Sequence, residues 1–529
     1  MFPRLFLPTP PAAPGRRRPP DEGALTLNAL ACAAALALAA APAHAQAPSD
    51  TTAAPVRSVD ARLRLGGEAV HLPDGTRIGL VGLTELFSVG GEWWFGPGVY
   101  GAVSGRRGGL FVPGVEVAWS HPFNEWLGVD AGLFAGGGGG ANAPVGGGLM
   151  LRPHVDLVIQ PFQGFYTGPT WSTVRFVNGQ IDSHQFGWMF NVSSSFRMRP
   201  ADLIVPHAPT DGHATGLGFD RIDLMLTEVH PRDTRHLSSG QPLTQTIGLV
   251  GMRAENTVGG GPLWVGLEAS GAAKGGVAGY AEVLGTGGLH WAAAGDRLSL
   301  DLRGSVGAGG GGDIDTGGGL LLKGAAGATL RITDTLGVSL EGGLLHAPHG
   351  HFDGRYVSVG LDWLLDPPSN GPGLWGSTSS AEATRMEFAT GIEHYDAARK
   401  DGRTAPLDAV MLQVNRFVAP NFYLTGQARS ALAGGAGAYS VGLVGIGTQW
   451  PVGHGVRVGA EALAGAAGGG GVDTGAGAVL QGRGYVDVAL GETVSLRVGA
   501  GRVKSVHGGL DAPVVDAALT FRFGVDRRR

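Results

Sequence analysis

The chain has 529 residues, of which only 16% are charged, whereas a soluble domain usually has about 25%. Its 39 Lys and Arg residues and 44 Asp and Glu residues give a formal net charge of −5, so electrostatics gives no reason to expect a nucleic-acid partner. Glycine is abundant, at 95 residues, but 43% of the residues are hydrophobic, which excludes a wholly disordered glycine-rich chain.

Residues 1–45 have the composition of a secretory signal peptide. Arg16-Arg17-Arg18 precede an alanine- and leucine-rich segment, and Ala43-His44-Ala45 form a small-x-small cleavage site. The only cysteine, Cys32, lies inside this segment. Cleavage would remove four basic and two acidic residues, leaving 35 − 42 = −7. We therefore expect an exported chain without disulfides, and no later apolar run is long enough for a transmembrane helix.

The remaining sequence repeats one unit three times. Each unit contains a tryptophan, then a glycine cluster 27, 26 or 25 residues later, then an Asn/His-Gly turn a further 32 residues on. These markers begin at Trp119, Gly146 and Asn178, at Trp291, Gly317 and His349, and at Trp450, Gly475 and His507. The recurrence predicts repeats at 56–198, 220–365 and 383–525. Two proline- and glycine-rich linkers, 199–219 and 366–382, would join them.

Within each repeat the dominant period is two. In the first repeat, Leu127, Val129, Ala131 and Leu133 alternate with glycine and aspartate, which is the pattern of a strand with one apolar face. Eight such segments are expected in this repeat, near 60–71, 77–88, 92–104, 109–120, 126–137, 146–160, 165–177 and 184–197. Segments of about ten residues with alternating polarity are typical of transmembrane β-strands.

Aromatic residues lie close to the expected turns. Three of them are equivalent in the repeats (Trp94, Trp264 and Tyr423), as are the three repeat markers Trp119, Trp291 and Trp450. We interpret these six residues as a ring at a membrane interface, where amphipathic side chains gather.

The signal peptide, the alternating strands, the aromatics and a last strand with Val515, Ala517, Leu519, Phe521 and Phe523 on one face resemble bacterial outer-membrane β-barrel proteins. The resemblance implies an all-β, antiparallel, up-and-down transmembrane barrel of about 24 strands. It implies the outer membrane of a Gram-negative bacterium, contact with outer-membrane lipid, and insertion by the outer-membrane assembly machinery. The chain departs from the pattern at its end, because residues 524–529 follow the aromatic Phe523.

Two closures are compatible with 24 strands: three eight-stranded barrels of the outer membrane protein A type, or one wide barrel. The polar faces carry glycine and opposite charges, namely Asp301, Arg303, Arg457, Glu461 and Arg497. We expect these charges to face the lumen, with Asp301 neutralising Arg303 and Arg457 neutralising Glu461. Small residues and paired charges suit a narrow, filled interior, so three small barrels are favoured.

The outer turn motif contains Asn178, Asp182, His349, Asp353, His507 and Asp511. His and Asp are possible metal ligands, but Asn-Gly and His-Gly also favour hairpin turns, and we expect a turn. The glycine clusters are interpreted as flexible outer hairpins. We expect no cofactor, metal or catalytic residue. The sequence favours a structural or passive-pore role that allows small solutes to pass. The alternatives are a surface-adhesion module using the glycine-rich loops and, third, an outer-membrane enzyme.

Overall fold

The structure is a computed structural model that describes residues 56–201, 219, 221–258, 261–294, 297–333, 336–364 and 384–525. The expected signal peptide, most of the first expected linker and all of the second lie outside these residues. The chain divides into Met1–His44 and Ala45–Arg529, and only the second unit is described below. Among the described residues, no helix is both long and apolar enough to cross a membrane.

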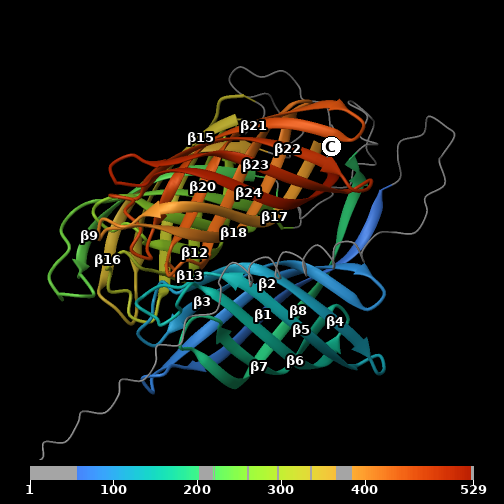
Figure 1. Cartoon of the computed structure of the whole chain (residues 1–529), viewed down its shortest axis with the longest axis horizontal. Helices are drawn as coiled ribbons and strands as arrows, with labels where there is room; N and C mark the ends of the chain where they lie inside the picture. Colours follow the sequence, from blue (N-terminus) through green and yellow to red (C-terminus); the bar gives the residue numbers. More distant parts are fainter. Residues whose placement is uncertain are drawn as a thin grey trace, which may run out of the picture. The chain divides into compact units, whose positions relative to one another are not determined.

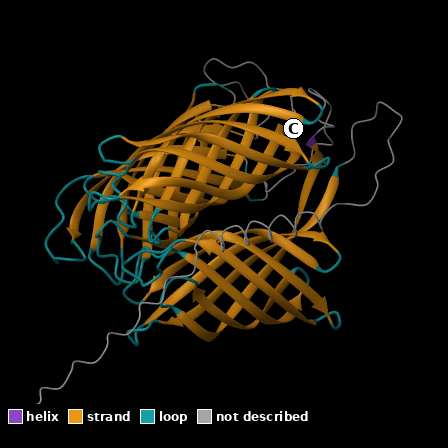
Figure 2. Cartoon of the chain, in the orientation of Figure 1, coloured by secondary structure: helices purple, strands orange, loops and turns teal. Residues whose placement is uncertain are grey.

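The described residues of the second unit form 24 β-strands, whose arrangement is drawn in Figures 1 and 2. This confirms the predicted all-β class and strand number, and every pairing between strands is antiparallel. The first eight strands lie within a few residues of the expected segments: β1 Arg57–His71, β2 Arg77–Gly90, β3 Trp93–Ser104, β4 Phe111–Pro122, β5 Leu127–Gly137, β6 Leu149–Phe162, β7 Phe165–Phe176 and β8 Asp182–Pro200.

The second and third sets of eight strands follow the same plan. The second set comprises β9 Arg221–Thr234, β10 Ile247–Thr257, β11 Leu263–Lys274, β12 Ala281–Ala293, β13 Leu298–Gly310, β14 Leu320–Arg331, β15 Leu336–His346 and β16 Phe352–Leu364. The third comprises β17 Thr384–Ala398, β18 Thr404–Ala419, β19 Phe422–Ala433, β20 Ser440–Gly453, β21 Val456–Gly468, β22 Ala478–Ala489, β23 Val494–Ser505 and β24 Asp511–Val525.

In each set the last strand pairs with the first. β9–β16 form a closed barrel. β8 pairs with β1, for example through Leu65 and Phe190, and β24 pairs with β17, for example through Phe388 and Phe521. We call the three closed sets ring 1 (β1–β8), ring 2 (β9–β16) and ring 3 (β17–β24). A short pairing of β24 with β8, which includes Phe523 and Pro200, joins rings 3 and 1.

Side chains alternate between the inside and the outside of each ring because successive residues of a strand point to opposite faces. In β13, Leu300 and Leu302 are 46% and 52% exposed, whereas Asp301 and Arg303 between them are buried. Every ring also encloses a cluster of buried apolar side chains. The interiors therefore hold both charged and apolar groups, and the outer surfaces are mainly apolar.

Glycine-rich loops connect the rings at the end where β3 meets β4 and β5 meets β6. The Gly108 amide of ring 1 donates to the Gly317 carbonyl of ring 2 (3.1 Å), and the Gly437 amide of ring 3 donates to the Gly146 carbonyl of ring 1 (3.1 Å). Between rings 2 and 3, a Cβ atom added to Gly279 would lie 2.8 Å from the Gly469 nitrogen. The loop between the third and fourth strands of each ring thus contacts the loop between the fifth and sixth strands of the next ring.

Candidate functional site

The interior of ring 1 is crossed by a buried ion-pair network. Arg64 of β1 lies 3.3 Å from Glu116 of β4 and 2.6 Å from Asp156 of β6. His154 lies 3.2 Å from each of these carboxylates. Three strands thus contribute to the same cluster, in which the positive group neutralises carboxylates that have left water. The Arg152 guanidinium, which lies 2.8 Å from a Glu68 oxygen, occupies the same interior.

Ring 2 holds a more acidic network, whose basic groups include Arg253 and Lys323. The buried Arg253 guanidinium lies 2.7 Å from Asp223, 2.8 Å from Glu255 and 3.3 Å from Glu341. Lys323 contacts Glu268 at 2.9 Å and also pairs with Glu282. Each carboxylate therefore faces at least one cation, which is the arrangement that a low-dielectric interior requires.

Ring 3 repeats the arrangement with different residues. Arg483 lies 2.7 Å from Glu461 and 2.8 Å from Asp516. Arg497 lies 2.7 Å from Glu387 and 3.2 Å from Asp487. These pairs join β17, β21, β22, β23 and β24, so they cross the ring as well as linking neighbouring strands.

The buried charges indicate that the ring interiors are filled. A water-filled channel would leave the charged groups along its wall exposed to water. Instead Glu116 and Arg497 are both 0% exposed. Eight strands enclose a space just wide enough for side chains to fill, and the ion-pair networks occupy that space in these rings.

The five charges predicted to face the lumen all lie inside the rings, but the expected pairs along one strand are wrong. Asp301 accepts from His290, and Arg303 pairs with Glu255 (3.2 Å) and Glu341. Arg457 pairs with Asp487 at 3.1 Å, and Glu461 pairs with Arg483. Residues two or four apart on a strand do share a face, yet carboxylates and cations from other strands lie nearer. Whether these charges affect permeation stays a prediction.

The predicted aromatic ring requires a correction, because three of its six members point inward. Trp264 is fully buried, with its ring 5.2 Å from that of His290 and the Arg303 guanidinium 4.9 Å above it. Tyr423 is also buried and donates to Glu461 at 2.7 Å. Trp94 is half-buried beneath the Arg62 guanidinium, at 4.4 Å.

The other three predicted interface residues are on the outer surface. Trp291 and Trp450 are 46% and 48% exposed, and Trp119 is half-buried. The alternation of side chains along each strand distinguishes the inward aromatic residues from the outward ones. Leu263 and Val265 flank Trp264 and are outward, so Trp264 has to face inward.

The outer turn motif forms the hairpin between the last two strands of each ring. Its aspartates make exposed pairs across that hairpin: Asp182 with Arg175 (3.9 Å), Asp353 with His346 (2.5 Å) and Asp511 with Arg502 (2.6 Å). Among the described residues, no group of three or more His, Cys, Asp and Glu side chains is arranged to hold a metal ion. The carbonyl oxygens of Asn178, His349 and His507 instead lie against glycines of the preceding loop.

Another outer hairpin carries an ordered carboxylate. Asp74, between β1 and β2, accepts from the Thr76 hydroxyl and amide, and Arg107 lies 3.1 Å away. The Thr76 hydrogen bonds, helped by Arg107, lower the pKa of Asp74 below its usual value. The group therefore stays charged in moderately acidic solution and keeps the first two outer loops joined.

The sequence predicts flexible hairpins at the glycine clusters. It does not predict that these hairpins contact neighbouring rings. Gly146, Gly317 and Gly475 all have positive φ, and their loops form the contacts between rings described above. The recurrence of glycine at matching positions was the available signal, but a repeat pattern alone does not identify which chain segment packs against it.

No family model and no curated protein sequence matches the chain. Solved structures with some similarity include Pseudomonas aeruginosa OpdQ, at 9% identity and a TM-score of 0.21, with 88% of this chain and 97% of that chain covered. Pseudomonas aeruginosa OccK10 (OpdN) gives 9% identity and a TM-score of 0.21, with 88% and 99% covered. The outer membrane channel DcaP of Acinetobacter baumannii gives 10% identity and a TM-score of 0.18, with 91% and 100% covered. This chain's own strand pairing and the polarity of its two surfaces identify a β-barrel protein.

Proposed function

We propose that the chain is an integral protein of the outer membrane of a Gram-negative bacterium, with three eight-stranded barrels whose filled interiors give it a structural role. The observation that carries the proposal is the inverted polarity of the rings. Charged side chains such as Arg483 and Glu461 are buried inside, whereas leucine, valine and tryptophan side chains are exposed outside. A soluble barrel would place its charges on the outside.

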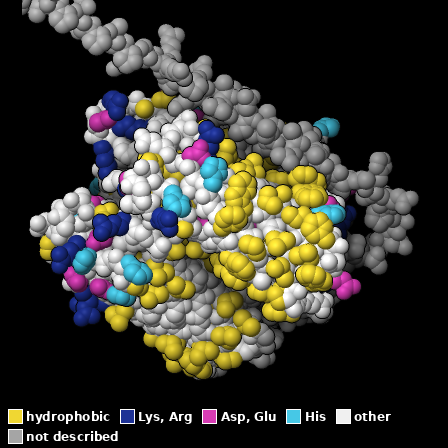
Figure 3. All heavy atoms as spheres, turned by 90° about the horizontal axis from the view of Figure 1, so that it is seen from below, with side chains coloured by type: hydrophobic (Ala, Val, Ile, Leu, Met, Phe, Trp, Pro, Cys, Tyr) yellow, Lys and Arg dark blue, Asp and Glu magenta, His cyan; other side chains and the backbone are white. Residues whose placement is uncertain are grey.

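The outer surface supports contact with lipid. Leu340 and Leu344 of β15 are each 58% exposed, and Val357 and Val359 of β16 are 48% and 50% exposed. Hydrophobic side chains form broad patches over the face drawn in Figure 3, and charged and histidine side chains gather mainly toward one end. A continuous apolar patch of this kind is unusual on a soluble monomer and is the expected surface of a transmembrane barrel.

The filled interiors favour a structural role over a wide passive pore. Ion pairs that are closed to water leave no continuous aqueous path in the parts of the rings that they occupy. The glycine-rich loops contact neighbouring rings, which supports a packing role for them and not an adhesive one. Small solutes would then pass only by rare opening of an interior network.

Export and insertion complete the proposal. The sequence of residues 1–45 supports a cleaved signal peptide. The last strand, β24, presents the aromatic residues Phe521 and Phe523, and the assembly machinery would have to accept a strand in which Gly524 and Val525 follow them.

Outer-membrane fractionation, heat-modifiable gel migration and planar-bilayer recording test the proposal together. We expect outer-membrane location, faster migration of the unheated form, and no large, stable conductance. A large, stable pore would reject the filled-barrel structure, and a protein found wholly in soluble periplasm would reject the membrane assignment.

A further inference from the structure

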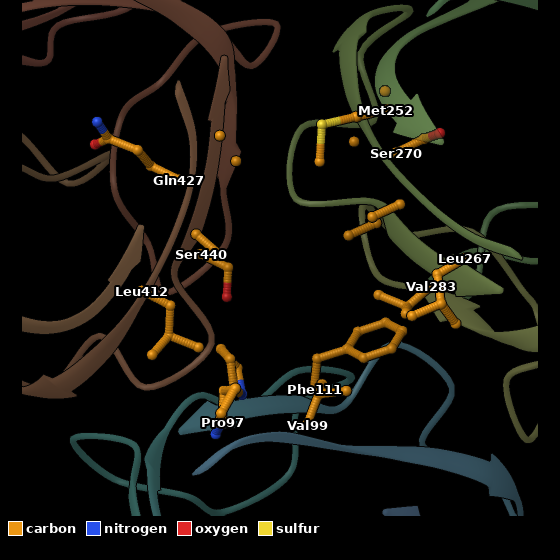
Figure 4. Close-up of a pocket in the computed structure, with 18 of the residues that line it drawn as sticks. Pro97, Val99, Phe111, Met252, Leu267, Ser270, Val283, Leu412, Gln427 and Ser440 are labelled. Atoms are coloured by element: carbon orange, nitrogen blue, oxygen red, sulfur yellow. The ribbon is translucent and has the colours of Figure 1, made fainter. Parts of the chain in front are cut away.

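The three rings enclose a cavity between them, separate from the ring interiors. Its volume is about 1020 Å³, at the upper end of the range of about 300–1,000 Å³ that is usual for ligand pockets. Figure 4 shows Pro97, Val99 and Phe111 of ring 1 facing the same space as Leu267 and Val283 of ring 2 and Leu412 of ring 3. All three rings therefore contribute walls to one cavity.

The walls are the outer faces of the strands. Val265 and Leu267 of β11 are 49% and 42% exposed, and Val414 of β18 is 46% exposed. The inward neighbours on the same strands belong to the ring interiors, as Gln427 does in Figure 4, where its side chain points away from the cavity. The cavity wall is thus continuous with the apolar surface that we propose faces the bilayer.

Water is a poor occupant of this cavity. A buried water molecule needs two to four polar partners, and the walls offer few polar side chains, among them Glu85, Ser194 and Ser440. Apolar side chains form most of the surroundings, including Val99, Leu267 and Val414. A cavity of this size and polarity favours an apolar occupant.

The loops that connect the rings lie at one end of the cavity and obstruct entry of such an occupant from that end. Gly109, Gly139, Gly279 and Gly468 line the cavity, and all four belong to the loop contacts at the end where β3 meets β4. These contacts connect the rings around that end. At the opposite end, where the odd-numbered strands of ring 1 begin, the short pairing of β24 with β8 joins rings 3 and 1 only. Entry is therefore expected from that end, which we propose faces the periplasm.

We propose that this cavity binds an acyl chain of a phospholipid from the periplasmic leaflet. The inference rests on the proposed membrane location, because only a barrel in a bilayer would offer its outer faces to lipid. The bound chain fills the space that three convex barrels leave between them and covers the apolar walls. A lipid of the other leaflet would have to pass the connected glycine loops.

Native mass spectrometry of the full chain, purified from outer membranes and exchanged into a second detergent, tests the site. The test variant combines Val265→Trp and Val414→Trp. These substitutions place larger side chains on two walls of the cavity, so that they fill part of it, and leave the ring interiors unchanged. Val357→Trp is the matched control, because Val357 is 48% exposed, like Val265 at 49%, but lies on β16 away from the cavity. Membrane fractionation and heat-modifiable migration are measured on every sample.

We expect the wild type and Val357→Trp to retain phospholipid after detergent exchange and the double variant to lose it, with all three proteins inserted and folded. Inserted wild-type protein that carries no phospholipid, or that carries only lipopolysaccharide, overturns the inference and leaves the membrane proposal standing. Equal retention by the double variant also overturns it. A wild-type protein that is absent from the membrane overturns the proposed function itself.

Discussion

A Cβ atom on Gly317 would lie 1.9 Å from the carbonyl oxygen of His349. The two residues belong to different sequence markers, 32 residues apart, and the structure joins them in one contact. The same contact recurs between Gly146 and Asn178 at 1.8 Å and between Gly475 and His507 at 2.5 Å. The constant spacing in the sequence therefore reflects a backbone contact between the fifth–sixth and seventh–eighth strand loops of each ring.

Replacing Gly317 by alanine is expected to lower stability. Its φ is +58°, a conformation that costs an ordinary residue about 1–2 kcal/mol, and the new methyl group would also collide with the His349 carbonyl. We expect a loss of about 2 kcal/mol or more, measured as a lower urea midpoint for the heat-modifiable form.

Gly324→Ala is the control for that substitution. Gly324 lies on β14, has no positive φ, and has no atom within 4 Å of an added Cβ. The control should unfold at the wild-type midpoint. Equal midpoints for Gly317→Ala and Gly324→Ala would show that the loop contact contributes nothing to stability.

Replacing Glu461 by leucine should destabilise ring 3 without altering the conductance recorded in a bilayer. Glu461 accepts from Arg483, Tyr423 and Gln413, each at 2.7 Å, and its loss leaves these buried donors short of a partner. Breaking a buried ion pair costs about 3–5 kcal/mol, and we expect the lower end because Asp516 still faces Arg483. Denaturant unfolding and bilayer recording measure the two effects.

The control for Glu461→Leu is Arg502→Gln, which removes an exposed pair with Asp511. Water already solvates both groups, so the unfolding midpoint should not move. An altered conductance for Glu461→Leu with an unchanged midpoint would reject a filled interior and support an open lumen.

The strands were predictable because their signal is local. The alternation of Leu127, Val129, Ala131 and Leu133 with small or polar residues is the direct result of a two-residue period, and β5 is found there. Ion-pair partners were not predictable in the same way. Asp301 and Arg303 lie two apart on one strand, but Arg303 pairs with residues 48 and 38 positions away, and only the closure of the ring brings these together.

The positions of Trp264 and Trp291 can be separated by lipid-dependent fluorescence quenching. Trp291 is 46% exposed on the outer surface, whereas Trp264 is buried against His290. In vesicles that contain brominated acyl chains, Trp291→Phe should lose a larger share of the quenchable emission than Trp264→Phe. The reverse order would place Trp264 at the lipid interface, as the sequence pattern first suggested.

The contact between rings 1 and 2 can be tested with a disulfide, because Cys32 is the only cysteine and precedes the expected cleavage site. A Cβ atom on Gly101 of β3 would lie 3.2 Å from the Ala308 Cβ of β13, close to the 3.5–4.5 Å range of disulfides. We expect Gly101→Cys combined with Ala308→Cys to form an intrachain disulfide in the oxidising periplasm, seen as a reductant-sensitive change in gel migration. Gly101→Cys combined with Ala466→Cys is the control, since Ala466 lies instead against Gly271 of ring 2. Crosslinking of the control pair, or of neither pair, would contradict this arrangement of the rings.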